Sequence, residues 1–235
     1  DLLQQKVWQE ATQGVDYVMH VASPFPRVLP KTEEELIRPA RKGTLNVLKA
    51  AASNGVEKVV LTSSSGAILY GKNRTRKVGT YTEEDWTNVN NRKDTTPYFR
   101  SKTLAERAAW EFMEKDDSGM KLSVICPGAV LGPVLEKDFG TSANVVIKLL
   151  DGHAPGLPDI GFELVDVRSI ADLHIRAMES EAADNERFIG ANGYLKFREM
   201  AEILRETYPD RKIPRRMLPN FVVRAYSLID ASVKP

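Results

Sequence analysis

The first half of the chain contains three short apolar runs, each followed by a turn of small residues or a turn that contains proline. They cover residues 15–22, 56–62 and 120–126, and none alternates apolar and polar positions cleanly. Such runs are typical of strands covered on both faces in a parallel sheet. Between them, apolar positions recur every three or four residues over 32–53 and 97–115, which predicts two long helices. This alternation predicts a doubly wound α/β sheet, with ligands at the carboxyl ends of its strands.

The pattern changes after residue 131. Residues 132–161 are rich in glycine and proline and are expected to be mostly loop. Further short elements are predicted in the order strand, helix, strand, helix: 163–165, 169–179, 186–190 and 197–208. The apolar tail at 219–229 is predicted to be helical. We therefore expect a sheet-containing core over 1–131 and a smaller lobe over 132–235, from which one strand near 185–190 returns to the sheet.

Composition narrows the class of protein. The 235 residues are 42% hydrophobic and 28% charged, which is close to a globular average and excludes disordered and fibrous classes. A formal net charge of +1 gives no reason to expect nucleic acid as a partner. The single cysteine, Cys126, permits no intrachain disulfide and favours a reducing compartment such as the cytoplasm. No apolar run is as long as a membrane span, so no membrane association is expected, and no His, Cys and Asp spacing indicates a metal site.

The strongest chemical signal is a tyrosine followed four residues later by a lysine at the start of a predicted helix. Tyr98 and Lys102 project on the same helix face. An ammonium near a phenol lowers the phenol's pKa, and a phenol tuned in this way can protonate the oxygen of a carbonyl that is being reduced. The same spacing also occurs by chance in many helices, so an ordinary structural role stays open.

Two turns add weaker signals. Residues 62–66, Thr-Ser-Ser-Ser-Gly, follow a buried strand directly, and their hydroxyls could donate to a substrate oxygen. Residues 126–133 follow the next strand, and their glycines and prolines permit a flat ligand to approach the backbone. Taken alone, each segment is more simply explained as an ordinary turn.

Taken in order, the serine-rich turn, the Tyr-x-x-x-Lys helix and the Pro-Gly turn resemble the extended short-chain dehydrogenases/reductases. The resemblance is to the dihydroflavonol-reductase-like group, which includes aldehyde, ketone and methylglyoxal reductases. It rests on residues 20–24 (HVASP), 98–106 (YFRSKTLAE) and 162–168 (FELVDVR), and it covers essentially the whole chain. It implies a Rossmann-like nucleotide-binding core that lacks its first strands, followed by a substrate-binding lobe.

The resemblance also implies site roles. Tyr98 would be the proton donor, Ser64 would hydrogen-bond the substrate carbonyl, and Lys102 would bind the nicotinamide ribose and lower the Tyr98 pKa. The implied cofactor-binding residues are Asp1, Leu2, Val21, Ala22, Ser23, Ser63, Tyr98, Lys102, Pro127, Gly128, Ala129, Val130 and Ser142. The implied cofactor is NADP by family habit, with NAD as the alternative.

The chain departs from the family pattern in three respects. The glycine-rich phosphate-binding turn is absent, and at roughly 30 residues per βαβ unit about 60 residues of the pattern precede Asp1. The polypeptide as written is therefore expected to bind dinucleotide poorly. Leu69 stands where plant dihydroflavonol reductases carry a flavonoid-binding Asn, which favours a more apolar carbonyl compound. Ala40 lies near the position of an Asn in many relatives, which argues against a proton relay through that side chain.

The leading hypothesis is NAD(P)H-dependent reduction of an aldehyde or ketone to an alcohol, with a small-molecule carbonyl as the partner and a monomer or homodimer as the assembly. Two alternatives remain. One is a nucleotide-sugar epimerase or dehydratase of the same superfamily. The other is a catalytically silent reductase-like scaffold.

Overall fold

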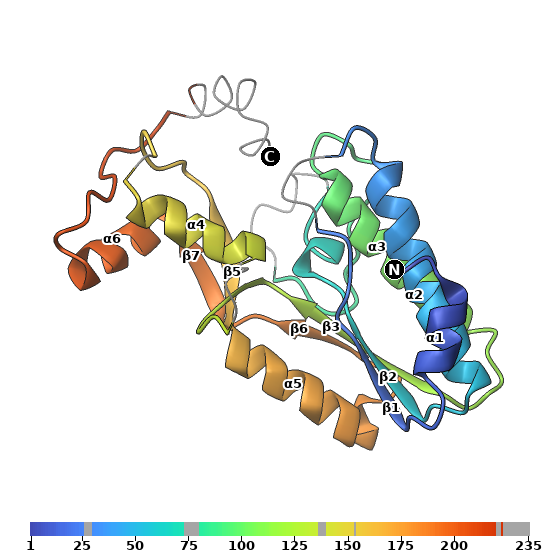
Figure 1. Cartoon of the computed structure of the whole chain (residues 1–235). Coiled ribbons are helices and arrows are strands. Elements are labelled where there is room, and N and C mark those ends of the chain that lie inside the picture. The colour runs from blue at the N-terminus through green and yellow to red at the C-terminus, as the bar shows by residue number, and fades with distance from the viewer. Residues whose placement is uncertain (26–29, 73–79, 136–139, 153, 220–221, 223–235) are drawn as a thin grey trace. The chain divides into compact units, whose positions relative to one another are not determined.

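The computed structural model describes residues 1–25, 30–72, 80–135, 140–152, 154–219 and 222 (Figure 1). The chain forms two compact units. The first contains the stretches Asp1–Phe25, Pro30–Gly128 and Ser169–Gly190. The second contains Ala129–Arg168 and the described residues from Ala191 onward.

A four-stranded parallel sheet is the centre of the first unit. In spatial order its strands are β1 (Tyr17–His20), β2 (Lys58–Thr62), β3 (Lys121–Pro127) and β6 (Arg187–Gly190). The two middle strands are buried, with no exposed surface at Val59, Leu122 and Val124. Burial on both faces explains why the apolar runs do not alternate. The α/β fold with a parallel sheet is confirmed.

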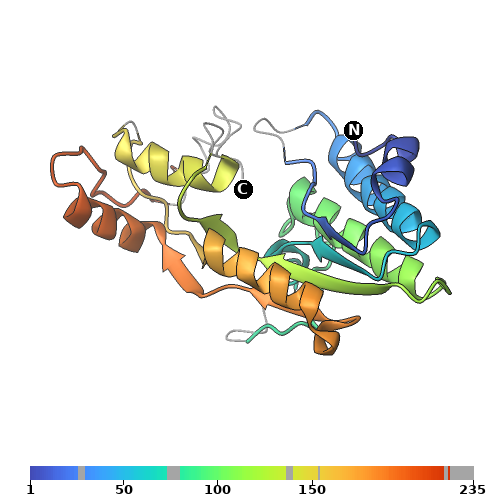
Figure 2. The same cartoon turned by 60° about the horizontal axis from the view of Figure 1, so that its bottom comes forward.

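Helices cover both faces of this sheet. On one face α2 (Glu34–Ser53) and α3 (Pro97–Met113) pack side by side, and α1 (Gln5–Ala11) packs on α2 (Figure 1). On the other face lies α5 (Val167–Glu179) (Figure 2). The Ile170 side chain of α5 packs over Gly190 of β6. The short 3₁₀ helices η1 (Ser65–Ala67) and η2 (Glu181–Ala183) follow β2 and α5.

Local signals account for the ends of the two long helices. The side chain of Thr96 accepts a hydrogen bond from the Phe99 N–H (3.2 Å), and Pro97 occupies the first helical position of α3. Gly55, just past the end of α2, has φ +72°, a left-handed conformation that costs glycine little. These two helices lie where the apolar periodicity predicts them.

The main hydrophobic core lies between the sheet and α2 and α3. Its buried members are Leu48, Ala51, Val56, Val59, Leu61, Ile68, Ala109, Met120, Leu122, Val124 and Cys126. The core spans β2, β3 and both helices, so the carboxyl ends of the strands and the first turns of α3 are held in a fixed geometry.

The second unit is built on a smaller sheet of three strands. Its strands, in spatial order, are β4 (Ala129–Leu131), β5 (Gly161–Asp166) and β7 (Gly193–Lys196). β4 pairs parallel and β7 antiparallel to β5. Two helices, α4 (Gly140–Leu150) and α6 (Phe197–Thr207), share a second core with this sheet.

Four elements of the structure differ from the sequence expectation. α4 lies inside the segment 132–161, which we expected to be loop, and α1, β4 and β7 have no counterpart in the prediction. β4 and β7 have three and four residues, too few to show a period, and they form by pairing with β5. The glycines and prolines around α4 mask its apolar stripe, because turn residues lower the local helix signal.

The division at residue 131 stays a prediction for the intact protein. In the structure the chain leaves the first unit after Gly128 and returns to it over Ser169–Gly190, which contains most of α5 together with β6. The predicted helical tail at 219–229 lies almost entirely outside the described residues. Among the described helices, none is both long enough and apolar enough to cross a bilayer.

Candidate active site

The serine-rich turn starts directly at the carboxyl end of β2. The Ser63 N–H donates to the Ile125 carbonyl oxygen (2.7 Å), which extends the pairing of β2 with β3 by one residue. The next residue, Ser64, caps η1: its hydroxyl oxygen accepts a hydrogen bond from the Gly66 N–H (3.0 Å). The backbone therefore fixes the Ser64 side chain at the carboxyl edge of the sheet.

Tyr98, in the first turn of α3, meets Ser64 at this edge. The Ser64 side chain is near enough to the phenol to influence its protonation. Burial raises the pKa of Tyr98 above 10.0, and the Ser64 hydrogen bond lowers it by a smaller amount. We expected Lys102 to lower this pKa. The structure differs because burial dominates, and a phenol with a raised pKa keeps its proton at neutral pH.

Lys102, one turn further along α3, is only 6% exposed. Its ammonium donates to the Thr62 carbonyl oxygen at the end of β2 (3.0 Å). Burial lowers the pKa of Lys102 from 10.5 to about 8, while Cys126 and Glu106 act in the opposite direction. The ammonium thus sits at the carboxyl edge and is only moderately favoured over the neutral amine at neutral pH.

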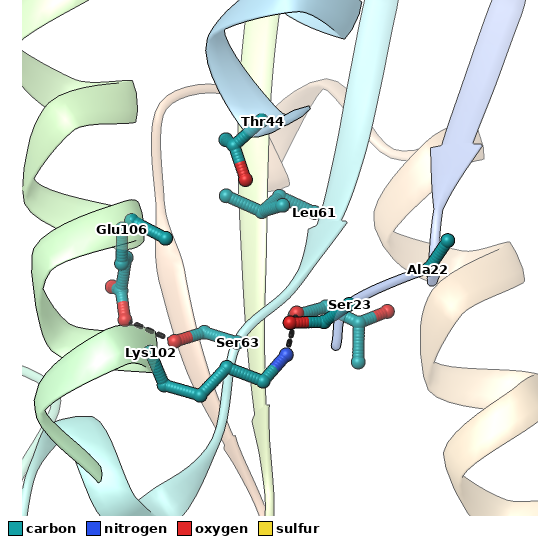
Figure 3. A pocket seen from close by; sticks show the side chains of 9 residues that line it. Ala22, Ser23, Thr44, Leu61, Ser63, Lys102 and Glu106 are labelled. Atoms are coloured by element: carbon teal, nitrogen blue, oxygen red, sulfur yellow. Dashed lines mark hydrogen bonds between the residues drawn. The ribbon is translucent and has the colours of Figure 1, made fainter. Parts of the chain in front are cut away.

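A small pocket surrounds the Lys102 ammonium (Figure 3). It is lined by Ala22, Ser23, Thr44, Leu61, Thr62, Ser63, Lys102, Ala105 and Glu106. Four of these, Ala22, Ser23, Ser63 and Lys102, belong to the predicted cofactor set. An ammonium carries three N–H donors, and among the described residues Thr62 accepts one of them. Hydroxyl pairs such as those of a ribose fit this donor set at the carboxyl ends of parallel strands.

Other predicted cofactor residues of the first unit lie elsewhere. Asp1 is exposed, and the Leu2 carbonyl oxygen accepts from the Asn46 side chain of α2 (3.0 Å). Val21 is 59% exposed just after β1. Pro127 ends β3, and the Gly128 N–H donates to the Gly190 carbonyl oxygen (3.0 Å).

Three predicted residues belong to the second unit. Ala129 and Val130 lie in β4, and Ser142 lies in the first turns of α4, where it is half-buried. Leu69, which the sequence suggested as a substrate-facing residue, is also half-buried and packs against the main core of the first unit. The roles of all these residues stay predictions.

Two charged residues of the site were missed by sequence reasoning. Glu106, 1% exposed, accepts hydrogen bonds from the Ser63 hydroxyl and from the Arg187 guanidinium, whose Nε lies 2.5 Å from Oε1. One signal for Glu106 was present: it continues the four-residue spacing of Tyr98 and Lys102 on a helix face that is otherwise buried. Arg187 gave no such signal, because 81 residues separate it from its partner.

Residues that the sequence suggested to be structural are engaged within the fold. The Thr62 hydroxyl lies 2.7 Å from His174 Nε2, and the Ile170 carbonyl oxygen lies 2.7 Å from His174 Nδ1. Cys126 is fully buried, and burial raises its pKa, so its thiol stays protonated. Among the described residues, no group of three or more His, Cys, Asp or Glu side chains is arranged to hold a metal ion.

His20, at the end of β1, is expected to make the protein less stable at acid pH. Burial and the nearby Lys102 ammonium lower its pKa from 6.5 to about 4. Between those values the unfolded chain binds a proton that the folded chain does not, so stability falls as the pH drops through this window. Urea unfolding at pH 5 should therefore show about 2 kcal/mol less stability from this residue than at pH 7.5. The His20→Phe variant should lose that part of the pH dependence; equal slopes in both proteins would contradict the assignment.

The turn that holds Ser64 has no space for a side chain at Gly66. A Cβ added at Gly66 would lie 2.4 Å from Cδ1 of Phe99, whose ring is stacked on Tyr70 (4.0 Å between centroids). The Gly66→Ala variant is expected to lose about 1–3 kcal/mol in urea unfolding, because the ring must move within a packed site. Gly193→Ala is the matched control, since its added Cβ has no atom within 4 Å. Equal effects of the two changes would refute the constraint.

A parallel sheet with helices on both faces, and a serine, a tyrosine and a lysine gathered at its carboxyl edge, define the extended short-chain dehydrogenase/reductase class. The family model described as the NAD dependent epimerase/dehydratase family matches residues 1–189. The chain belongs to this family.

Curated relatives and solved structures agree with this assignment. The chain is 37% identical over 220 residues to a cinnamoyl-CoA reductase, CAD2, of Medicago truncatula, covering 92% of the chain and 66% of the relative. It is 35% identical to tetraketide alpha-pyrone reductase 1 of Arabidopsis thaliana, with coverage of 92% and 66%. The crystal structure of yeast methylglyoxal/isovaleraldehyde reductase Gre2 complexed with NADPH is similar with a TM-score of 0.81 and 30% identity, covering 92% of this chain and 68% of that one. The chain thus spans about two thirds of the length of these curated relatives.

Proposed function

We propose that the protein reduces an aldehyde or ketone to the alcohol with NADPH. The observation that carries this proposal is that the Ser64 side chain lies beside the Tyr98 phenol at the sheet edge and lowers its pKa, with the Lys102 ammonium one helical turn away on α3. The similar proteins named cinnamoyl-CoA reductase and methylglyoxal/isovaleraldehyde reductase support a carbonyl substrate, and the NADPH complex of the latter supports the cofactor.

The chain's own residues can be given roles in this reaction. When bound, NADPH supplies the hydride that reduces the carbonyl carbon. Ser64 and Tyr98 would both donate hydrogen bonds to the carbonyl oxygen, and this polarises the carbonyl and fixes its position. Tyr98 would then transfer its proton to that oxygen as negative charge develops there. The Lys102 ammonium would hold ribose hydroxyls and favour the phenolate that remains after proton transfer.

The finer details of the proposal follow from the same residues. Leu69 favours an apolar carbonyl compound over a flavonoid. The proposed cofactor is NADP, with NAD as the alternative. A reducing compartment such as the cytoplasm suits the single buried thiol of Cys126. The proposed assembly is a monomer or homodimer that binds no nucleic acid and no membrane.

The test follows NADPH absorbance in the intact protein with a panel of apolar and polar aldehydes and ketones. We expect NADPH consumption with equimolar alcohol formation, fastest for apolar members of the panel. A parallel arm measures turnover of UDP-sugars with NAD. If only UDP-sugars are converted, the proposal is wrong and the epimerase or dehydratase alternative takes its place. Absence of NADPH binding would leave the silent scaffold as the function.

A further inference from the structure

A buried ionic network lies directly behind the proposed catalytic groups. Its centre is Glu106, which is 1% exposed and lies on α3 one turn after Lys102. The carboxylate accepts from the Ser63 hydroxyl at the end of β2 and from the Arg187 guanidinium of β6. It also lies 3.7 Å from the Cys126 sulfur of β3. One side chain thus joins α3 to three neighbouring strands of the sheet.

Arg187 extends the network to the segment that follows β2. Its guanidinium donates to the carbonyl oxygens of Glu83 and Asp85, the latter at 2.8 Å. It also lies 3.8 Å from the ring centroid of Trp86. Arg187 is 9% exposed, so these contacts replace most of the hydration of its charge.

A buried carboxylate is costly unless hydrogen-bond and ion-pair partners compensate for its lost hydration. Removing a buried charge from water carries a large penalty, which good ion-pair geometry only offsets. A structural tie between α3 and β6 alone could be made by apolar packing at no such cost. The distinctive feature is instead the line of Tyr98, Lys102 and Glu106 along one face of α3, with the pocket lined by both Lys102 and Glu106 (Figure 3).

We propose that Glu106 is a positioning residue of the site: its carboxylate ties the Ser63–Ser64 turn to α3 and places a negative charge one helical turn from the Lys102 ammonium. This inference rests on the proposed function. Glu106 contacts neither the carbonyl substrate nor the transferred proton, and it acts through its two neighbours. Arg187 holds the carboxylate in place and leaves the trio of Lys102, Glu106 and Arg187 with one net positive charge.

The charges around Lys102 support this role. From β1, His20 is kept neutral by burial, with a pKa lowered to about 4. From β3, Cys126 remains a thiol because burial raises its pKa. On α3 itself Tyr98 remains a phenol, and β2 contributes the Thr62 carbonyl oxygen as a neutral acceptor. Cys126 and Glu106 both raise the Lys102 pKa, and of these two Glu106 is the one that bears a carboxylate, one helical turn from Lys102.

The first measurement needs neither cofactor nor substrate. Lysine side chains are labelled with ¹³C and ¹⁵N, and the Lys102 signal is identified by its loss in Lys102→Met. In the wild type the signal should titrate near pH 8, as the Lys102 pKa of about 8 indicates. In Glu106→Gln the midpoint should fall by on the order of one pH unit. Glu111→Gln, at an exposed position of the same helix, should leave it unchanged. An unchanged midpoint in folded Glu106→Gln would overturn the proposal.

A second variant covers the case in which Glu106→Gln does not fold, because it leaves Arg187 buried without its partner. The double variant Glu106→Gln/Arg187→Met removes both charges, and removing both is far less costly than removing one. The Lys102 midpoint should lie lower in this variant than in Arg187→Met alone, because these two proteins differ only in the Glu106 charge. Equal midpoints in the two variants would refute the proposal.

Activity gives an independent readout in the intact protein. The high-pH limb of kcat/KM for NADPH-dependent reduction should move to lower pH by the same interval as the Lys102 midpoint. A purely structural Glu106 would instead lower kcat/KM equally at every pH, and that result would contradict the proposal. If the Lys102 midpoint shifts but no carbonyl is reduced by any variant or the wild type, the electrostatic role stands and the proposed function is the part that fails.

Discussion

Replacement of Tyr98 by phenylalanine is expected to lower kcat for carbonyl reduction by about 10²–10⁴-fold in the intact protein, the usual range for the loss of a general acid. The change removes the hydroxyl that neighbours Ser64 and leaves the ring in place against Phe25, 4.4 Å away between centroids. Because the ring and its packing remain, the loss should appear in kcat with little change in stability. Initial rates of NADPH oxidation at saturating carbonyl concentration measure it.

Tyr17→Phe is the matched control for this experiment. Tyr17 lies at the other end of the sheet, at the start of β1, where its hydroxyl donates to the exposed Glu57 carboxylate (3.0 Å). The control removes the same atom from the same residue type and should leave kcat within experimental error. A Tyr98→Phe enzyme as active as the Tyr17→Phe control would refute the proton-donor role.

Replacement of Lys102 by methionine is expected to lower kcat/KM by about 10²–10³-fold, the range found when one preorganised electrostatic group is removed from an active site. Methionine fills a similar volume, so the core around α3 should stay packed. NADPH binding should weaken as well, because the proposed donor to the ribose hydroxyls is gone. Lys115→Met, at an exposed position after the end of α3, is the control. Unaltered NADPH affinity and rate in Lys102→Met would remove Lys102 from the site.

The Lys102 pKa also predicts in which direction activity and stability change with pH. Burial lowers the Lys102 pKa to about 8, so the ammonium form, and the activity that depends on it, should decline as the pH rises through that value. The contribution of Lys102 to stability runs the other way. In the unfolded chain the lysine keeps its proton up to the ordinary pKa of 10.5, so folding becomes more favourable as the pH rises from about 8 to 10.5. Urea unfolding curves that show no loss of stability above pH 8 would therefore separate the activity decline from denaturation.

Much of the fold follows from local pattern. The strands β2 and β3 and the helices α2 and α3 lie within a few residues of the predicted segments. Each has an apolar pattern that is long enough to be recognised and is followed by a turn. The same regularity predicts that Ser64 and Tyr98 lie close together. A residue after a parallel strand and a residue in the first turn of the following helix both lie at the carboxyl edge of the sheet.

The sequence alone determined the parallel α/β architecture, the Tyr-x-x-x-Lys helix and the edge of the sheet at which that helix begins, since all three depend on contacts within one βαβ unit. Only the tertiary structure decided the rest. Glu106 and Arg187 are joined across 81 residues, and β4 and β7 are too short to form without β5. The Tyr98 pKa is set by how deeply the phenol is buried rather than by its spacing from Lys102. Burial and long-range charge pairing are properties of the packed chain, so no local pattern encodes them.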